Sequence, residues 1–252
     1  MTAIWPAYRA ELLKLKRTLA LAVTFAAPAA VVALQMLVWL RNREGFDVDA
    51  DLWLSFVNNV LAMWALFMYP MLAALVAALI YHLEYASTGW LRVYTWPTPR
   101  WVIPSAKLAA LLTLLTVASV VLVVGCVAGA WLVGLVHPRI DLPEEIPVAD
   151  ILSRWGRVAA AGLFFVAIQN FVSLWWASMT LSLGVAMVGT FVGLFASGWK
   201  AGIYYPWLVP LRTLYGRDDE PAIALAVGVF GGLLVLAATL VVAVRREPGR
   251  YQ

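Results

Sequence analysis

Uncharged apolar stretches, each long enough to cross a lipid bilayer, constrain the fold of this chain most strongly. They cover residues 19–40, 53–81, 108–136, 158–195 and 222–244. About 20 such residues in a helix span the ~30 Å of bilayer hydrocarbon, and only a helix pairs all its backbone groups within a single segment there. Only 13% of the residues are charged, against about 25% in soluble domains. The sequence therefore predicts an all-α integral membrane protein.

The stretch 158–195 is too long for one crossing, because a single helix of that length would measure roughly 57 Å. We expect two short helices there, joined by a turn near residues 178–180. The prediction is six transmembrane helices in a single transmembrane domain, residues 1–252. The spans are about 19–40, 53–81, 108–136, 158–177, 181–197 and 222–244, and Pro70 is expected to kink the second of them.

Residues 1–18 form a different kind of segment. Four apolar residues recur at helical spacing along one face: Trp5, Tyr8, Leu12 and Leu15. The charged residues Arg9, Glu11, Lys14, Lys16 and Arg17 fall mostly elsewhere. This pattern is typical of an amphipathic helix that lies in the interface plane of the membrane.

The basic residues set the expected orientation. Lys14, Lys16 and Arg17 directly precede the first span, whereas Arg41 and Arg43 after it are accompanied by several acids. Because Lys and Arg concentrate on the cytoplasmic side, we expect both termini to lie inside. The segment from His82 to Lys107 is then cytoplasmic, and the segments 41–52 and 137–157 are outside.

The residues needed for common catalytic or metal sites are missing from the sequence. His82 and His137 are the only histidines, they fall at opposite ends of the predicted topology, and Cys126 is the only cysteine, so a metal site is not expected. The sequence contains no G-x-S-x-G and no P-loop motif. We expect a protein that is not an enzyme, has no catalytic residues, holds no cofactor of its own and binds no nucleic acid.

A few polar residues interrupt the predicted spans. The clearest are Asn58, Asn59, Gln169, Asn170 and Ser173. Such side chains can hydrogen-bond between neighbouring helices, or they can line a transport path. The pattern leaves both roles open.

The connector from His82 to Lys107 is far longer and more aromatic than a link between two helices requires. Its aromatic residues include Tyr85 and Trp90, and its basic residues include Arg92 and Arg100. Gly89 permits close approach to another surface, while Pro97 and Pro99 stiffen the return. Aromatic and arginine side chains are enriched at protein interfaces, but tryptophan and tyrosine also gather at lipid headgroups. The connector therefore indicates either a docking surface or an aromatic belt.

The segment AELLKLKRTLALAVTFAAP, residues 10–28, resembles the start of ABC-2-type transporter permeases. The similar branch serves lantibiotic immunity and related bacteriocin or drug export, and tends to begin with E-x-x-K-x-K-R. A second feature of those permeases is a Glu, a Gly, a P-x-x-R and a Lys at the third span. Here they read Glu84, Gly89, Pro97 with Arg100, and Lys107.

The resemblance implies a type V ABC exporter-like architecture in a bacterial cytoplasmic (inner) membrane. The connector would then carry a coupling helix that docks in a cleft of a separate ATPase chain, and that chain would hold ATP and Mg. The residues expected in this contact are Glu84, Tyr85, Gly89, Trp90, Arg92 and Arg100. Further expected partners are a second permease subunit, identical or related, and the lipid bilayer.

The connector between the last two spans, residues 198–220, also fits the family. Family members carry a short re-entrant helical element on the outer face at this point. The corresponding residues here are Tyr204, Tyr205, Pro206, Trp207 and Pro210.

The resemblance thus implies a permease subunit that exports an amphipathic peptide antibiotic, drug or lipid-like molecule. The alternative is a non-transporting membrane anchor or regulatory subunit of a partner complex.

Overall fold

The computed structural model describes residues 4–16, 18–41, 52–86, 99–136, 146–176 and 178–245, and these ranges are almost entirely helical. No strand occurs within them. Six helices in these ranges are long and apolar enough to cross a membrane. The predicted all-α fold with six spans is therefore confirmed.

Each span consists of one helix or of two helices in line. The spans are α2 (Leu19–Arg41), α3 (Leu52–Met63) continuing through the π-helical turn η1 (Trp64–Met68) into α4 (Tyr69–Ala86), α6 (Val102–Val136), α7 (Val148–Ala161) followed by α8 (Leu163–Trp175), α9 (Met179–Ala196) and α11 (Glu220–Arg245). The shorter elements are α1 (Ile4–Leu15) before the first span, and the 3-10 turn η2 (Lys200–Tyr204) and α10 (Val209–Tyr215) between α9 and α11.

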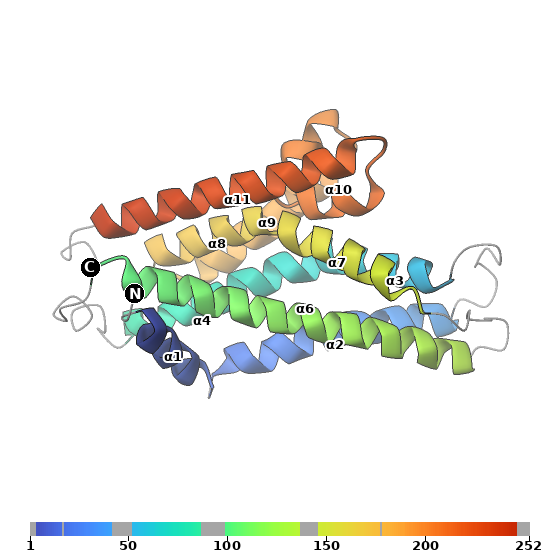
Figure 1. Cartoon of the computed structure of the whole chain (residues 1–252), viewed down its shortest axis with the longest axis horizontal. Coiled ribbons are helices and arrows are strands. Elements are labelled where there is room, and N and C mark those ends of the chain that lie inside the picture. Colours follow the sequence, from blue (N-terminus) through green and yellow to red (C-terminus); the bar gives the residue numbers. More distant parts are fainter. Residues whose placement is uncertain are drawn as a thin grey trace.

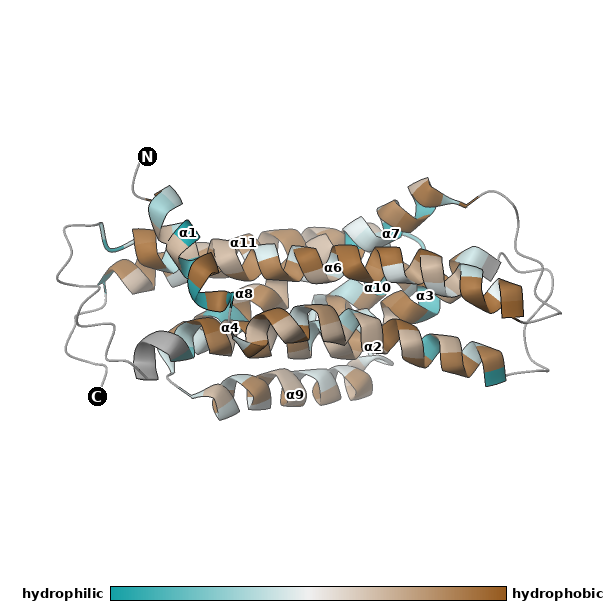
Figure 2. Ribbon diagram, turned by 90° about the horizontal axis from the view of Figure 1, so that it is seen from below, coloured by the Kyte–Doolittle hydropathy of each residue, from teal (hydrophilic) through white to brown (hydrophobic). Residues whose placement is uncertain are grey.

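The spans run along the long axis of the molecule, as Figure 1 shows. α1 and the C-terminal end of α11 lie at the same end of the bundle, which we call the proximal end (Figure 1). The N-terminal end of α7 lies at the opposite, distal end, and α10 lies towards it. Apolar residues run along the helices, and hydrophilic residues are conspicuous on α1 (Figure 2). This distribution fits a bundle with its middle in hydrocarbon.

Two spans begin earlier than the apolar pattern predicts. α6 starts at Val102 rather than at residue 108, and therefore contains Lys107. α7 starts at Val148 rather than at residue 158, and contains Arg154 and Arg157. The reason is that a charged side chain does not interrupt the backbone hydrogen bonds of a helix. The end of an uncharged stretch thus marks a change of environment and not the end of the helix.

Two irregularities lie where the sequence predicts them. α8 ends at Trp175 and α9 begins at Met179, close to the expected turn. Ser178 caps α9, since its Oγ accepts a hydrogen bond from the Leu181 N–H at 3.2 Å. In the second span, the π-helical turn Trp64–Met68 ends two residues before Pro70. Proline lacks an N–H and crowds the carbonyl one turn back, and the wider π turn accommodates it.

Close contact between α11 and the α7–α8 pair depends on two glycines. A Cβ on Gly228 would lie 2.5 Å from the Cα and carbonyl oxygen of Ala161, and one on Gly232 would lie 2.8 Å from the carbonyl carbon of Leu163. The glycines are four residues apart and share one face of α11. Small residues at this spacing let helix backbones approach closely in membranes. The approach stabilises the bundle by van der Waals contact.

We expect Gly228→Ala to destabilise the protein by about 1–3 kcal/mol, because the new methyl group would meet backbone atoms that cannot rotate away. Gly184→Ala is the matched control, since a Cβ at that helical position meets no atom within 4 Å. It should leave stability unchanged or raise it by up to ~1 kcal/mol. Thermal unfolding of the two purified variants in detergent measures the difference. Equal stability in both variants would contradict the close-packing role of Gly228.

Candidate functional site at the proximal end of the bundle

A buried ion pair joins the N-terminal helix to the third span. The Nζ of Lys107 on α6 lies 2.9 Å from Glu11 Oε2 on α1. The same Nζ donates a hydrogen bond to the backbone oxygen of Ile80 on α4, at 3.2 Å. Lys14 donates to the other carboxylate oxygen of Glu11, at 2.7 Å. Lys107 is completely buried and Glu11 is 3% exposed. This one cluster therefore holds α1, α4 and α6 together.

The helical geometry of α1 explains how Glu11 reaches the interior. Glu11 and Leu15 are four residues apart, so they share a face, and both are buried. Tyr8 lies on the same side and its hydroxyl makes a 2.9 Å hydrogen bond with the Thr113 hydroxyl on α6. Trp5, predicted on the apolar face, is 63% exposed. The face that packs on the bundle thus contains an acid, which hydropathy alone assigns to the polar side.

The charges of this cluster favour the ionised forms. Burial raises the pKa of Glu11, but the attraction of Lys107 and the hydrogen bonds from Lys14 and Lys107 outweigh it and bring the pKa below its usual value. Glu11 is therefore a carboxylate at neutral pH. A buried ion pair contributes little net stability compared with apolar residues of the same shape, but loss of one partner leaves an uncompensated charge. The pair consequently specifies where α1 sits.

A second polar group connects the same region to α8 and α9. The Lys107 Nζ lies over the ring of Tyr81, 5.5 Å from its centre, and the Tyr81 hydroxyl donates to Asn170 Oδ1 at 3.1 Å. One turn away, Ser173 Oγ lies 3.0 Å from Ser182 Oγ on α9, and Ser182 Oγ donates to the Ala74 carbonyl on α4 at 3.3 Å. These contacts link α4, α8 and α9 side by side.

Gln169 completes this polar group from the middle of α8. With its nitrogen directed at the Ser182 carbonyl and its oxygen at the Ala186 N–H, both at 3.2 Å, its amide is satisfied by the backbone of α9. We call Tyr81, Gln169, Asn170, Ser173 and Ser182 the inner polar network. All five are buried.

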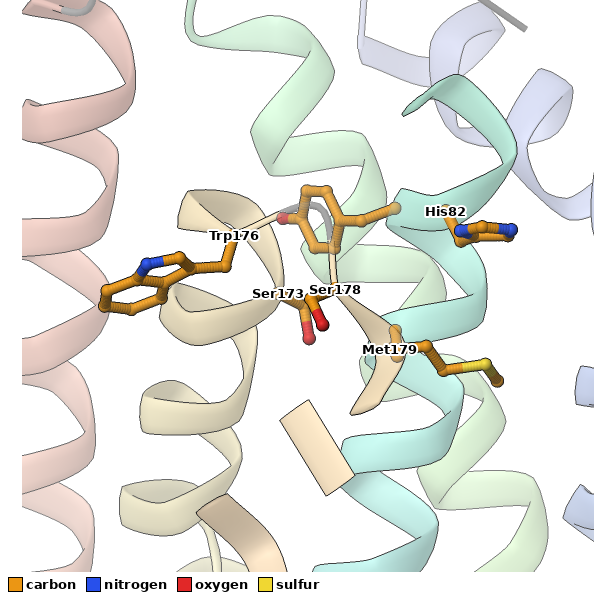
Figure 3. Close-up of a pocket in the computed structure, with 7 residues that line it drawn as sticks. His82, Ser173, Trp176, Ser178 and Met179 are labelled. Atoms are coloured by element: carbon orange, nitrogen blue, oxygen red, sulfur yellow. The ribbon is translucent and has the colours of Figure 1, made fainter. Parts of the chain in front are cut away.

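A small cavity adjoins this network between the ends of α4 and α8 and the start of α9. It has a volume of about 10 Å³, and its lining includes Tyr81, Ser173 and Ser178. Figure 3 shows Trp176 pointing away on one side and His82 and Met179 on the other. A space of this size holds about one water molecule. It therefore belongs to the hydrogen-bonded packing of the helices and has no room for a larger ligand.

The structure separates the polar residues that the sequence grouped as one transport path. Gln169, Asn170 and Ser173 hydrogen-bond between helices, which is one of the two roles left open. Asn58 lies elsewhere, near the distal end, where its Oδ1 accepts a 2.9 Å hydrogen bond from Arg154 Nη1. Asn59 is exposed. The sequence could not show that the two groups lie apart, because it contains no long-range distances.

The expected coupling residues fall mostly outside the described residues. Gly89, Trp90 and Arg92 lie there, and so do the side chains of Glu84 and Tyr85, although their backbone belongs to the last turns of α4. Arg100 is described and is exposed just before α6. The coupling role of these residues stays a prediction.

The expected outer element consists of η2 and α10. Trp207 and Pro210 are buried, Tyr205 and Pro206 are half-buried, and Tyr204 is exposed. The Tyr205 hydroxyl donates to the Gly189 carbonyl on α9 at 2.9 Å. Arg212 forms an ion pair with Glu220 at the start of α11, at 3.5 Å. The segment is thus folded against α9 and α11, and its position relative to the membrane stays a prediction.

Within the ranges that the structure describes, no group of three or more His, Cys, Asp or Glu side chains lies close enough to hold a metal ion.

The sequence pattern places Lys107 only at the start of the third span. In the structure, Lys107 is the residue that joins α1, α4 and α6 at the proximal end. The sequence did hold a signal for this contact. Lys107 directly precedes a long uncharged stretch, and Glu11 lies on the predicted amphipathic helix at the membrane surface.

We expect Glu11→Leu to cost about 3–5 kcal/mol of stability, because it removes the 2.9 Å ion-pair contact of the buried Lys107 ammonium. Lys107→Met should cost a similar amount, and the double variant Glu11→Leu with Lys107→Met should recover most of the loss. Lys14→Met, at the more exposed partner, should cost less than ~1 kcal/mol. Unfolding of the four variants in a dodecyl sulfate titration measures these values. If the two single losses simply add in the double variant, the pair is not coupled.

Comparison with known proteins adds one match. A family model described as "ABC-2 family transporter protein" matches residues 7–193, which run from α1 through most of α9. No curated protein matches the chain. The matched region contains both partners of the buried ion pair and the whole inner polar network.

Proposed function

The chain belongs to the ABC-2 family of transporter proteins, and from this premise we propose a specific role for it. Members of the family are transmembrane subunits of ABC transporters, are generally not catalytic themselves, and associate with an ABC ATPase in a membrane. We propose that this subunit exports an amphipathic peptide antibiotic, drug or lipid-like molecule from a bacterial cytoplasmic membrane. It does so with a second permease subunit and with separate ATPase chains that bind ATP and Mg.

The observation that carries the proposal is the Glu11–Lys107 ion pair. Each partner comes from a different motif that resembles the permeases: Glu11 opens the N-terminal motif and Lys107 closes the connector motif. Their 2.9 Å contact ties α1 to α6 at the point where the connector between α4 and α6 returns to the bundle. A push on that connector by an ATPase would therefore move α1, α4 and α6 together.

The inner polar network supports the next step of the mechanism. Tyr81 contacts Lys107 with its ring and Asn170 with its hydroxyl, so a shift of α4 acts directly on α8. Ser182 then links α8 and α4 to α9. Buried, fully paired polar contacts resist sliding between helices, because each broken contact leaves an unsatisfied group in an apolar surrounding. We infer that these helices re-orient as connected units when ATP binding closes the ATPase pair.

The cargo class is inferred from the resemblance of residues 10–28 to permeases of lantibiotic immunity and drug export. The exterior of the bundle is compatible with cargo taken from the lipid phase. Large apolar side chains such as Phe195 and Leu234 are exposed on the peripheral helices, and in hydrocarbon they face lipid. A cargo dissolved in the membrane can approach such a surface without crossing water.

Orientation follows the basic residues around the first span, and we propose that the proximal end faces the cytoplasm. In a Cys126→Ala background, a cysteine in place of Asp219, an exposed residue just before α11, should react with an impermeant thiol reagent added to intact cells. A cysteine in place of Arg100, exposed just before α6, should react only after the cells are opened. The reverse pattern would invert the topology and remove the connector from the ATPase side.

The coupling contact is tested by Trp90→Ala and Arg92→Glu. Loss of an interface tryptophan costs ~2 kcal/mol or more, about a thirty-fold loss of affinity, and Arg92→Glu reverses the charge offered to an acidic cleft. We expect both variants to insert normally, to retain less ATPase subunit during purification and to lose substrate-stimulated ATP hydrolysis. Trp199→Ala is the matched control, because Trp199 is an exposed tryptophan after α9, next to η2.

Full ATPase retention and activity in Trp90→Ala and Arg92→Glu would count against the coupling role. The connector would then be an aromatic belt at the headgroups, and the chain would fit the alternative of a membrane anchor or regulatory subunit. Copurification of a stoichiometric ATPase with the tagged wild-type chain separates the transporter from that alternative directly.

A further inference from the structure

A cavity of about 140 Å³ lies between α4, α6, α7 and α8. Its walls are mainly apolar, with Leu115 on α6 and Leu163 and Val166 on α8. Four residues add polar groups: Tyr69 on α4, Thr116 and Ser119 on α6, and Trp155 on α7. A mostly apolar space with a few converging polar groups is the usual form of a small-molecule site. Neither the coupling contact nor the inner polar network uses any of these residues.

The indole nitrogen of Trp155 is the group that points to a ligand. It is removed from solvent and has no hydrogen-bond partner. A buried N–H without an acceptor is costly. The same side chain lines the cavity, so an acceptor in the cavity that reached this nitrogen would remove the cost.

An aromatic stack holds Tyr69, which lines another part of the cavity wall. The ring of Tyr69 lies parallel to Trp64, with centres 5.5 Å apart, and meets Phe165 edge-on at 5.0 Å. Gly162 lies beneath it, and a Cβ at that position would come within 2.5 Å of the Tyr69 ring. Tyr69 cannot turn into the cavity without losing these contacts. The cavity therefore does not simply collapse.

Two backbone irregularities meet at the same place. The π-helical turn ends at Met68, directly before Tyr69, and the break between α7 and α8 is at Gly162, directly before Leu163. π turns inside helices occur frequently at functional sites. Here one irregularity from each of two spans places a cavity-lining residue.

The size and chemistry of the cavity define its occupant. An apolar cavity of ~150 Å³ accepts a benzene-sized molecule, so the space fits one ring or the end of a short chain. The polar groups are hydroxyls and an N–H, and a charged group would lose its hydration without gaining a counter-ion. We propose that this cavity binds an uncharged apolar group that carries one hydrogen-bond acceptor, with the acceptor on Trp155 Nε1. The ligand is part of an amphipathic molecule dissolved in the membrane, and its identity as cargo rests on the proposed function.

Binding is measured with the full chain in lipid nanodiscs, labelled with 5-fluorotryptophan and assigned by Trp155→Phe. The probe is acetophenone, a single ring with one carbonyl. We expect a saturable shift of the Trp155 fluorine resonance and no shift of Trp207, whose buried Nε1 also lacks a partner but lies outside this cavity. Ethylbenzene, which has no acceptor, should bind about tenfold more weakly, the factor that one hydrogen bond contributes.

Ser119→Leu fills the cavity and should abolish the saturable shift. Val120→Leu is the matched control on the same helix, because Val120 is exposed to the outside of the bundle. It should bind the probe as the wild type does. Ala159→Val fills the cavity from α7 and replaces Ser119→Leu if that variant does not insert.

Nanodiscs of different lipid composition show whether the natural ligand is a membrane lipid or another molecule dissolved in the membrane. If ester phospholipids compete with acetophenone and ether phospholipids without carbonyls do not, the cavity holds a membrane lipid. If acetophenone binds equally in both, the site is open to other membrane-dissolved molecules, which is the expected behaviour of a cargo site. The proposal fails if Trp155 shows no saturable response in either lipid, or if Ser119→Leu responds as the wild type does. No ATPase is needed, so this result is independent of the Trp90→Ala test.

Discussion

Hydrocarbon offers no partner to a backbone N–H or carbonyl, so each spanning segment must satisfy these groups within its own helix. This constraint explains most of the architecture, above all the six helical spans. It also explains the form of the exceptions. Where Pro70 removes a donor, the chain widens into a π turn without leaving the helix, and at Gly162 it continues directly from α7 into α8.

The same constraint gives polar side chains an organising role. Lys107 is fully buried, and its ammonium is satisfied by Glu11, by the Ile80 carbonyl and by the face of Tyr81. Such contacts cannot be exchanged for water, so they fix which helices are neighbours and in what register. In a permease subunit this matters at the end where a connector returns to the bundle, because displacement there has to reach several spans at once.

Different parts of the bundle are held together by different interactions, close packing in one region and polar pairing in another. α11 is held against α7 and α8 by glycines that bring backbones into contact. The proximal ends of α1, α4 and α6 are held by an ion pair instead. At the cavity lined by Tyr69 and Trp155, neither close packing nor polar pairing is complete. An incompletely satisfied space inside an otherwise well-packed bundle is where a ligand gains most from binding.

The sequence by itself determined the six spans, the amphipathic α1, the turn near Ser178 and the irregularity at Pro70, because hydropathy, helical period and proline chemistry act over one or two turns of chain. It also marked Glu11 and Lys107 as parts of two motifs. Only the tertiary structure decided that these two residues, which are 96 positions apart, form one buried pair. It likewise decided that Asn58 belongs with Arg154 and not with Gln169, and that Trp155 lines a cavity. Such outcomes depend on which helix faces lie against each other. Packing across the whole bundle decides this, and no local pattern in the sequence contains that information.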